Sequence, residues 1–378
     1  MRICYIANAA YNLHFARWYN YFLEKGHEVH VVSGDPSRVT HEVTIPGITV
    51  HYLPEEKLKS HVLSFGYNLL KLPLIIWELR RILKKISHDI VHAHQVYAEG
   101  MWAALADFHP FIVTPIGSDL LIHTHESFVL RIISNYVLRK ADLITCDSVV
   151  LQDEIFRFGG TPDKTHLIFN GIDFSMFHSL VDSSVIRNKY KIGNSPLVLS
   201  VRNLDAVYNI DSVIKSIPAV LKFIPDAKFI FCYIETSVDQ LNPHKLVNEL
   251  GLEGSVILAG TIPREDMPCY YAAADVCISV PSSDSSPNSV YESMACGTPV
   301  IVSDVPWTKH FMKDRQNCLM IPARDSGAIS DAIIEILKNE HLRNRLAENA
   351  HSTVKRYVDY YINMEKLASL MDGLKRVS

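Results

Sequence analysis

Apolar positions in the first half of the chain occur in short continuous runs that alternate with stretches of helical period. The continuous runs predict strands at residues 2–7, 27–32, 89–93, 111–114, 142–146 and 166–169. A helix is expected at 15–25, where Gly26 ends it, and another at 74–86, where apolar residues recur every 3.6 positions. Strands that alternate with helices predict a parallel, doubly wound sheet whose functional residues lie at the carboxyl ends of strands.

The same alternation resumes in the second half, after a polar segment at residues 179–195. Strands are expected at 197–201, 228–233, 255–258, 276–280 and 299–302, and helices near 211–223, 242–249, 264–273, 289–295 and 327–338. The polar segment leads into Gly193-Asn194-Ser195-Pro196, which is typical of a linker. We therefore predict an N-terminal domain at 1–185, a C-terminal domain at 196–356 and a last helix at 357–374.

The composition is that of a folded protein with two cores. The 378 residues exceed the usual size of one core, and 48% of them are hydrophobic. The net charge is -4 without a block of like charges, so nucleic acid is not expected as a partner. Seven scattered cysteines without C-x-x-C spacing indicate reduced thiols in a cytoplasmic protein. The first residues predict a strand instead of a signal peptide, so no export is expected.

The segment from Pro281 to Ile301 carries the most informative chemistry. A strand ends in a loop of small residues with Asp284, and a helix with Glu292 follows. The amides around Pro287, Asn288 and Ser289 lie at the start of this helix, where backbone dipoles attract an anion. Two structural interpretations stay open, a capping box between Ser289 and Glu292 and a turn formed by Asp284 with its own backbone.

This segment resembles the Glu-x7-Glu element of the retaining GT-B glycosyltransferases of family 4, the glycosyl transferases group 1. The resemblance covers nearly the whole chain and implies an α/β fold with two facing Rossmann-like, doubly wound parallel-sheet domains, a cleft between them, and the helix at 357–374 crossing back to the first domain. It also implies that Glu292 holds the ribose hydroxyls of a sugar nucleotide and that Asp284 lies against the donor sugar.

The segment from Leu199 to Asp211 resembles the family element in which an arginine and a lysine hold the donor phosphates. Arg202 fits the arginine position, with an ion pair at the end of a strand as the structural alternative. Tyr208 and Asn209 occupy the positions of the lysine and a glycine, so one cation at the diphosphate is missing. Arg264, which follows the turn that begins at Gly260, is the candidate substitute.

The strand at residues 89–93 ends in His92-Ala93-His94, which resembles the family's His-x-His strand end. Alternation along a strand places both histidines on one side. The resemblance implies that His94 faces the sugar as a catalytic residue together with Asp284 and Glu292, whereas His92 is expected to be structural. Candidate residues on the acceptor side are Asn8, Ala10, Gly117 and Asp119.

The resemblance therefore implies a hexosyltransferase of the EC 2.4 class that moves a sugar from a nucleoside diphosphate sugar to an acceptor hydroxyl in polysaccharide, glycolipid or glycoconjugate synthesis. No Asp-x-Asp pair occurs in the sequence, so neither a metal nor a cofactor is expected. Two alternatives stay open, a GT-B sugar-nucleotide epimerase and a degenerate transferase that serves as a binding or scaffold subunit.

The partners expected are the sugar nucleotide and a sugar, lipid-linked or glycan acceptor. Basic residues alternate with leucines and Trp77 between Lys57 and Lys85. They form either a solvated helix face or a surface for peripheral contact with the inner face of an anionic membrane.

Overall fold

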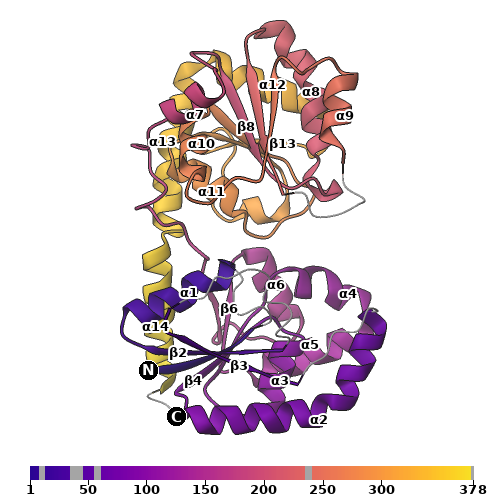
Figure 1. Cartoon of the computed structure of the whole chain (residues 1–378), viewed down its shortest axis with the longest axis vertical. Coiled ribbons are helices and arrows are strands. Elements are labelled where there is room, and N and C mark those ends of the chain that lie inside the picture. The colour runs from indigo at the N-terminus through magenta and orange to yellow at the C-terminus, as the bar shows by residue number, and fades with distance from the viewer. Residues whose placement is uncertain (8–12, 35–45, 55–60, 235–240, 376–378) are drawn as a thin grey trace. The chain divides into compact units, whose positions relative to one another are not determined.

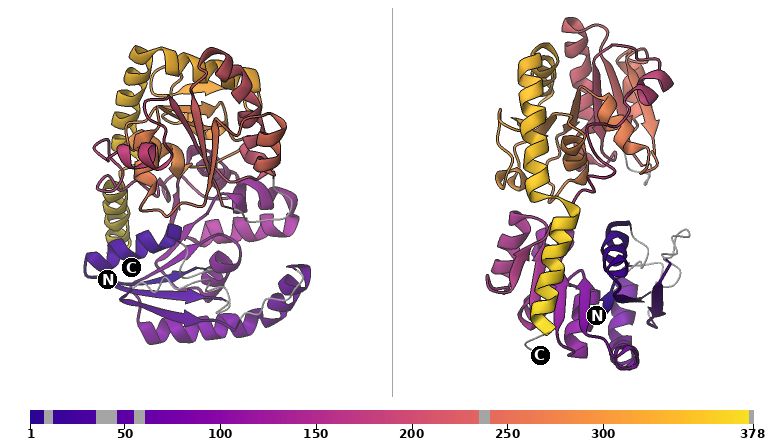
Figure 2. Two further views of the ribbon diagram at one scale, coloured as in Figure 1. Left: turned by 45° about the horizontal axis from the view of Figure 1, so that its top comes forward. Right: turned by 90° about the vertical axis from the view of Figure 1, so that its left-hand side faces the viewer.

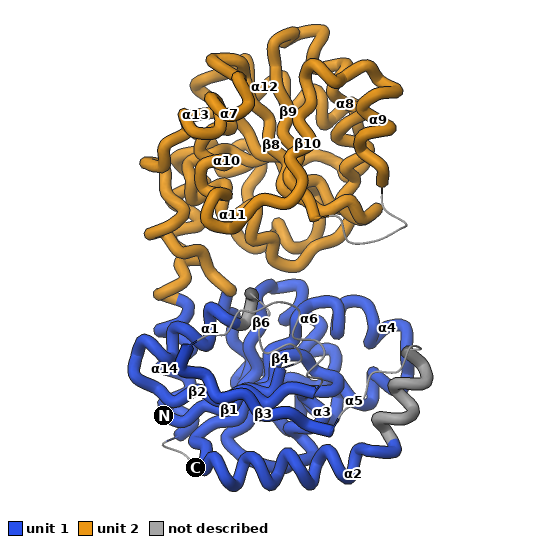
Figure 3. Tube along the Cα trace, viewed as in Figure 1, with its two compact units in different colours: residues 1–169, 363–378 blue, residues 170–362 orange. Residues whose placement is uncertain are grey.

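The structure, a computed structural model, describes residues 1–7, 13–34, 46–54, 61–234 and 241–375. The chain divides into two compact units (Figure 3). Unit 1 comprises Met1–Phe169 and Asn363–Ser378, and unit 2 comprises Asn170–Ile362.

Unit 1 contains a seven-stranded parallel sheet. Its strands are β1 (Arg2–Ile6), β2 (Glu28–Ser33), β3 (Ile48–Tyr52), β4 (Ile90–His94), β5 (Phe111–Thr114), β6 (Leu143–Cys146) and β7 (Thr165–Leu167), in the order β3-β2-β1-β4-β5-β6-β7. Helices cover both of its faces (Figures 1 and 2), namely α1 (Leu13–Glu24), α2 (His61–Ile86), α3 (Ala98–Ala106), α4 (Thr124–Glu126), α5 (Phe128–Lys140), α6 (Val149–Arg157) and the last helix, α14 (Tyr360–Lys375). A π-helical turn at Asp119–His123 directly precedes α4.

Unit 2 contains a six-stranded parallel sheet. Its strands are β8 (Leu197–Val201), β9 (Lys228–Cys232), β10 (Val256–Gly260), β11 (Val276–Ser279), β12 (Val300–Ser303) and β13 (Leu319–Ile321), in the order β10-β9-β8-β11-β12-β13. The helices are α7 (Ser184–Lys189), α8 (Ile210–Phe223), α9 (Pro243–Glu249), α10 (Met267–Ala273), α11 (Asn288–Ala295), α12 (Ser326–Lys338) and α13 (Glu340–Tyr357), with 3₁₀ turns at Ala206–Tyr208 and Pro306–Lys309. The predicted fold of two Rossmann-like parallel-sheet domains is confirmed.

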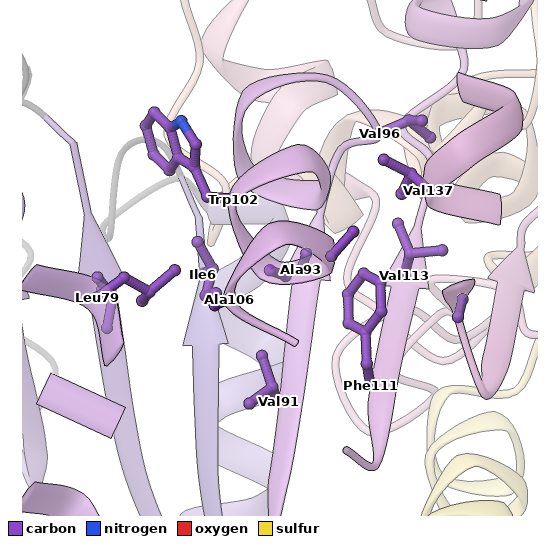
Figure 4. Packing of buried hydrophobic residues seen from close by; sticks show 14 of the residues in the cluster. Ile6, Leu79, Val91, Ala93, Val96, Trp102, Ala106, Phe111, Val113 and Val137 are labelled. Atoms are coloured by element: carbon purple, nitrogen blue, oxygen red, sulfur yellow. The ribbon is translucent and has the colours of Figure 1, made fainter. Parts of the chain in front are cut away.

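The core of unit 1 explains why its strands are continuous apolar runs. Val91, Ala93 and Phe111 of the central strands belong to one buried cluster with Trp102 of α3 and Leu79 of α2, and all five are nearly fully buried (Figure 4). Because helices cover both faces of a parallel sheet, each strand buries side chains on both sides and loses the polar alternation of a half-exposed strand.

The strand order reverses at one place in each sheet. In unit 1 this place is between β1 and β4, and in unit 2 it is between β8 and β11. Connections on the two sides of such a point leave toward opposite faces, so the chain leaves an open crevice beyond the carboxyl ends of these two strands. The structure therefore points to the residues that follow β8 and β11 as the place for a ligand in unit 2.

The division between the units differs from the boundaries expected at residues 185 and 196. The polar segment before the expected boundary already belongs to unit 2, where Arg187 of α7 donates from Nη2 to the Ala273 carbonyl at 2.8 Å and to Asp275 Oδ2 at 3.0 Å. The sequence lacks a hydrophobic period there because the segment is held by hydrogen bonds instead of a broad apolar face.

The ends of two helices also differ from the sequence prediction. The helix expected at 74–86 is the second part of α2, which begins at His61 and contains Pro73 in its interior. Proline removes a backbone donor and normally interrupts a helix, so the earlier turns escaped the prediction. The helix expected at 357–374 is α14, and the chain returns to unit 1 at Asn363.

Candidate functional site

Arg202 and Asp284 meet at the point where the strand order of unit 2 reverses. Arg202 directly follows β8, and Asp284 lies in the loop between β11 and α11. Arg202 Nη2 and Asp284 Oδ2 are 2.8 Å apart, and the side chains are only 10% and 17% exposed. The ion pair considered for Arg202 thus exists, but it is largely buried at the edge of the sheet where a ligand is expected.

Further contacts fix both side chains. Arg202 Nε donates to Ser279 Oγ at 2.7 Å, and its guanidinium lies 5.2 Å from the ring centre of Tyr208. Asp284 Oδ1 accepts the amide of the next residue, Ser285, at 2.8 Å, and this bond holds the carboxylate within its own loop. In this position the guanidinium can donate hydrogen bonds to a phosphate, but the carboxylate of Asp284 balances part of its positive charge.

Glu292 lies on α11 with its carboxylate buried between two donors. Arg264 Nη1 donates to Oε1 at 3.0 Å, and the Tyr271 hydroxyl donates to Oε2 at 3.0 Å. The capping box with Ser289 is not formed, because the N-cap residue of α11 is Pro287 and makes no side-chain cap hydrogen bond. Glu292 therefore faces a charged and hydroxyl-bearing cluster instead of its own helix end.

Burial sets the protonation of this cluster. Tyr271 is fully buried, and desolvation followed by the nearby charge of Glu292 raises its pKa well above the usual value. The phenol therefore keeps its proton and acts as a donor to the carboxylate. Arg264 also lies over the ring of Phe177, 5.2 Å from its centre. A carboxylate fixed in this way keeps lone pairs that can accept hydroxyl groups of a ligand.

The other predicted donor residues lie along the same edge of the sheet in unit 2. Gly260 ends β10 with φ 64°, a left-handed angle that suits glycine, and a Cβ built there would meet no atom within 4 Å. Asn288 and Ser289 are the first residues of α11, whose first amides have no partner within the helix. Their contact with a donor phosphate stays a prediction.

His92 and His94 are both buried in unit 1. His92 Nε2 and Thr114 Oγ1 are 2.6 Å apart, and the ring of His94 lies 5.2 Å from that of Tyr5 and 5.4 Å from that of Trp18. Desolvation lowers the pKa of His92 to about 3 and that of His94 well below its ordinary value. Both imidazoles are therefore neutral near pH 7, and a catalytic role of His94 stays a prediction.

Asp119 positions backbone in unit 1. It is fully buried, and its carboxylate accepts the amides of Val96 at 3.0 Å, Gly117 at 3.1 Å and Leu120 at 3.0 Å, with a further amide from Ile116. These bonds join the loop after β4 to the turn after β5, so the carboxylate has little capacity left for an acceptor. Gly117 has φ 103° and allows this turn.

Two further expectations concern ligands and membranes. Asn8 and Ala10 lie outside the described residues. Within the described ranges, no group of three or more His, Cys, Asp or Glu side chains could hold a metal ion. Over the same ranges, none of the helices is both long and apolar enough to cross a membrane.

Two side chains that donate hydrogen bonds at this edge of the sheet, those of Tyr271 and Arg324, were not predicted from the sequence. Tyr271 lies within a helix whose apolar pattern predicts an ordinary core residue. Arg324, in the loop between β13 and α12, donates from Nε to Asn209 Oδ1 at 2.9 Å and to Ser282 Oγ at 3.1 Å. The only signal for Arg324 would have been its place after a strand in a parallel sheet.

Two sequence families match the chain. The family described as glycosyl transferases group 1 matches residues 182–353, and the family described as glycosyl transferase 4-like matches residues 2–148. The first match contains every predicted donor-binding residue in unit 2, and the second contains His94 and Asp119 of unit 1.

Curated relatives and solved structures agree with these families. N-acetyl-alpha-D-glucosaminyl L-malate synthase of Bacillus anthracis is 21% identical over 346 residues, which are 88% of this chain and 85% of that protein. Lipopolysaccharide core biosynthesis glycosyltransferase LpsE of Rhizobium meliloti is 37% identical over 113 residues, 30% of this chain and 33% of that protein. The structure of Anabaena Alr3699/HepE in complex with UDP has a TM-score of 0.80 at 18% identity, covering 99% of this chain and 100% of that chain, and so shares the fold.

Proposed function

Because the chain belongs to the group 1 glycosyltransferases of the GT-B fold, we propose that it moves a hexosyl group from a nucleoside diphosphate sugar to an acceptor hydroxyl with retention of the anomeric configuration. The observation that carries this proposal is the presence of two ion pairs at the carboxyl edge of the sheet in unit 2, the largely buried pair of Arg202 with Asp284 and the pair of the partly exposed Arg264 with the buried Glu292.

Each ion pair suits a different part of a sugar nucleotide. The carboxylate of Glu292 is held by Arg264 and Tyr271, and its remaining lone pairs accept the two ribose hydroxyls. The guanidinium of Arg202 provides fixed donors for the diphosphate, and the carboxylate of Asp284 accepts a hydroxyl of the sugar. The pairs fix these groups before the ligand arrives, so little ordering is required on binding.

The leaving diphosphate develops negative charge as the glycosidic bond to the nucleotide breaks. Guanidinium groups and the first amides of α11 stabilise this charge, because donors that are fixed in advance lower the barrier without reorganisation. The sequence offers no Asp-x-Asp pair for a divalent cation. Transfer is therefore expected to continue at an unchanged rate in excess EDTA, and a loss of activity that Mg²⁺ or Mn²⁺ restores would contradict metal independence.

A donor screen tests the reaction. Uridine and guanosine diphosphate sugars are incubated with the protein, and release of the nucleoside diphosphate is measured with and without added glycan or lipid-linked acceptors. The proposal expects release with at least one donor and a large loss of release in Glu292→Ala. Formation of an epimeric sugar nucleotide would favour the epimerase instead, and binding without any turnover would favour a scaffold subunit. The anomeric coupling of the product, measured by NMR, tests retention.

Exposed side chains on α2 support an acceptor that is held at a membrane. Leu70, Leu74 and Trp77 are 83%, 48% and 59% exposed, and the guanidinium of Arg81 lies 5.6 Å from the ring centre of Trp77. Large apolar side chains next to basic ones are typical of helices that lie in the interface of an anionic bilayer. Co-sedimentation with anionic liposomes at low salt tests this contact. Wild-type protein is expected to bind and Trp77→Glu to bind less, and no binding by wild-type protein would contradict it.

A further inference from the structure

Three arginines lie at the carboxyl edge of the sheet in unit 2, and their charges are balanced differently. Arg202 is paired with Asp284, and Arg264 is paired with Glu292. Arg324 instead donates from Nε to the neutral oxygens of Asn209 and Ser282, and no ion pair of the described residues includes it. Among the described residues, Arg324 therefore lacks the carboxylate partner that Arg202 and Arg264 have, although Asp205 and Asp211 line the same cavity.

Arg324 belongs to the same network as the donor site. The amide of Asn209 donates from Nδ2 to the Val280 carbonyl at 2.7 Å and to Ser282 Oγ at 3.0 Å, which joins the loop after β8 to the end of β11. Arg324 binds to both of these residues from the loop after β13. Ser282 is two residues before Asp284, and its amide donates to the carbonyl of Val207 next to Tyr208. Arg324 is thus bonded, through Ser282, to the loop that carries Asp284.

The backbone at Arg324 is unfavourable for an arginine. Its φ is 64°, and the Asn209 to which it binds has φ 54°. Residues other than glycine and asparagine rarely adopt these left-handed angles, at a free energy of about 1 to 2 kcal/mol. Glycine would satisfy the same backbone at Arg324 with less strain. The side chain is exposed and borders a cavity of about 510 Å³, so the strain is not offset by burial.

We propose that Arg324 binds the diphosphate of the sugar nucleotide and supplies the positive charge that the two ion-paired arginines of the site do not. This inference rests on the donor site proposed above. Tyr208 contributes no charge to the loop after β8, and its ring lies against the guanidinium of Arg202. The loop after β13 therefore provides the second cation from the other side of Asn209. Because Nε is bound to the protein, the two Nη groups of the fork are the ones directed to the phosphate oxygens.

Replacement of Arg324 by glycine separates this role from a structural one. In Arg324→Gly the backbone is relieved, so the melting temperature is expected to stay the same or to rise. Affinity for UDP or GDP, measured by calorimetry, is expected to fall about tenfold or more, because a charge-assisted contact to phosphate is lost. Affinity for the corresponding nucleosides is expected to be unchanged. Arg324→Lys restores the charge without the fork and is expected to recover part of the affinity.

Arg315 provides a matched control. It is also an exposed arginine of unit 2 with a left-handed backbone, at φ 57°, but it is paired with Glu335. Arg315→Gly makes the same change in charge and in backbone freedom away from the predicted donor residues. It is expected to leave the affinity for UDP and GDP unchanged, so any effect specific to Arg324 cannot come from net charge alone.

Each outcome decides the inference. Wild-type affinity for the diphosphate in Arg324→Gly overturns it, and so does an equal loss for diphosphate and nucleoside together with a lower melting temperature, which marks a structural residue. If Arg324→Gly does not fold, the comparison of diphosphate with nucleoside is made on Arg324→Lys, where a fork-specific loss supports the inference and an unchanged ratio overturns it. If wild-type protein binds neither UDP nor GDP, the donor site itself is refuted and this role of Arg324 with it.

Discussion

Replacing Glu292 by glutamine tests the donor site with little change in shape. The carboxylate is 5% exposed and accepts one bond from Arg264 and one from Tyr271, both at 3.0 Å. The glutamine oxygen can keep the bond to Arg264, and the hydroxyl of Tyr271 can rotate to accept from the new amide group. The bond with Tyr271 becomes a neutral one, and Arg264 keeps a charge-assisted bond but loses its ion pair, which together reduce the free energy of unfolding by about 2 kcal/mol.

If Glu292 holds the ribose, the substitution weakens ligand binding as well as stability. A loss of about 2 kcal/mol lowers the melting temperature of a domain of this size by roughly 4 to 8 °C. A carboxylate that accepts ribose hydroxyls contributes about 1.5 to 3 kcal/mol, so the dissociation constant for UDP or GDP is expected to rise about 10- to 150-fold. Thermal unfolding and calorimetry on the same samples measure the two effects separately.

A matched control comes from Glu335, which is partly exposed and paired with the exposed Arg315 in the same unit. Glu335→Gln is expected to change the melting temperature by less than about 2 °C and to leave nucleotide affinity unchanged, because exposed ion pairs contribute little. A Glu292→Gln protein with a lower melting temperature but wild-type affinity for UDP and GDP would show that Glu292 is a structural residue and would refute its assigned role.

Two further predictions concern unit 1. The pKa of His92 is lowered to about 3, so between about pH 6.5 and pH 3 the unfolded chain binds a proton that the folded chain does not. Stability is complete well above pH 6.5 and falls as the pH is lowered, by about 1.4 kcal/mol at pH 5.5 for this histidine. His92→Asn is therefore expected to show a shallower decline of stability with falling pH in urea unfolding. Asp119→Asn leaves buried amides such as those of Val96 and Leu120 without an ionised acceptor, so it is expected to lower the free energy of unfolding by about 3 kcal/mol. Nucleotide affinity, measured by calorimetry, is expected to stay unchanged. A loss of affinity at unaltered stability would contradict this positioning role.

The strands and their carboxyl ends could be predicted because they depend on local pattern. β4, β8 and β11 are short apolar runs between turns, and parallel sheets bury such runs on both faces. The position of Arg202 after β8 and of Asp284 after β11 follows directly. Their ion pair could only be anticipated once the two strands were known to be neighbours in the sheet.

Contacts between distant parts of the chain could not be read from spacing. The bond between Arg264 and Glu292 joins residues 28 positions apart, and the bond between Arg324 and Asn209 joins residues 115 positions apart. Each depends on the order of strands and on the conformation of two loops at once. The sequence motif Ser289-x-x-Glu292 favours a capping box, but the donors offered by Arg264 and Tyr271 are the ones that the buried carboxylate takes.

Asp119, one of the candidates for the acceptor side, positions backbone amides in the structure, and its contact with an acceptor stays a prediction. Asp119 follows a strand and a glycine turn, which is the typical place for a ligand contact. In the fold its carboxylate satisfies backbone amides that the two loops leave open. A buried carboxylate stabilises the folded state when it accepts hydrogen bonds from backbone amides that have no other partner. Which amides lack a partner depends on the conformation of the two loops and cannot be predicted from the sequence.

The central claim is that unit 2 binds a nucleoside diphosphate sugar at the carboxyl ends of β8 and β11. A crystal structure of the protein soaked with UDP or GDP tests it most directly. The account predicts the ribose hydroxyls within hydrogen-bond distance of Glu292 and the diphosphate between Arg202 and Arg324. A nucleotide bound at another place, or with its ribose away from Glu292, would contradict the account.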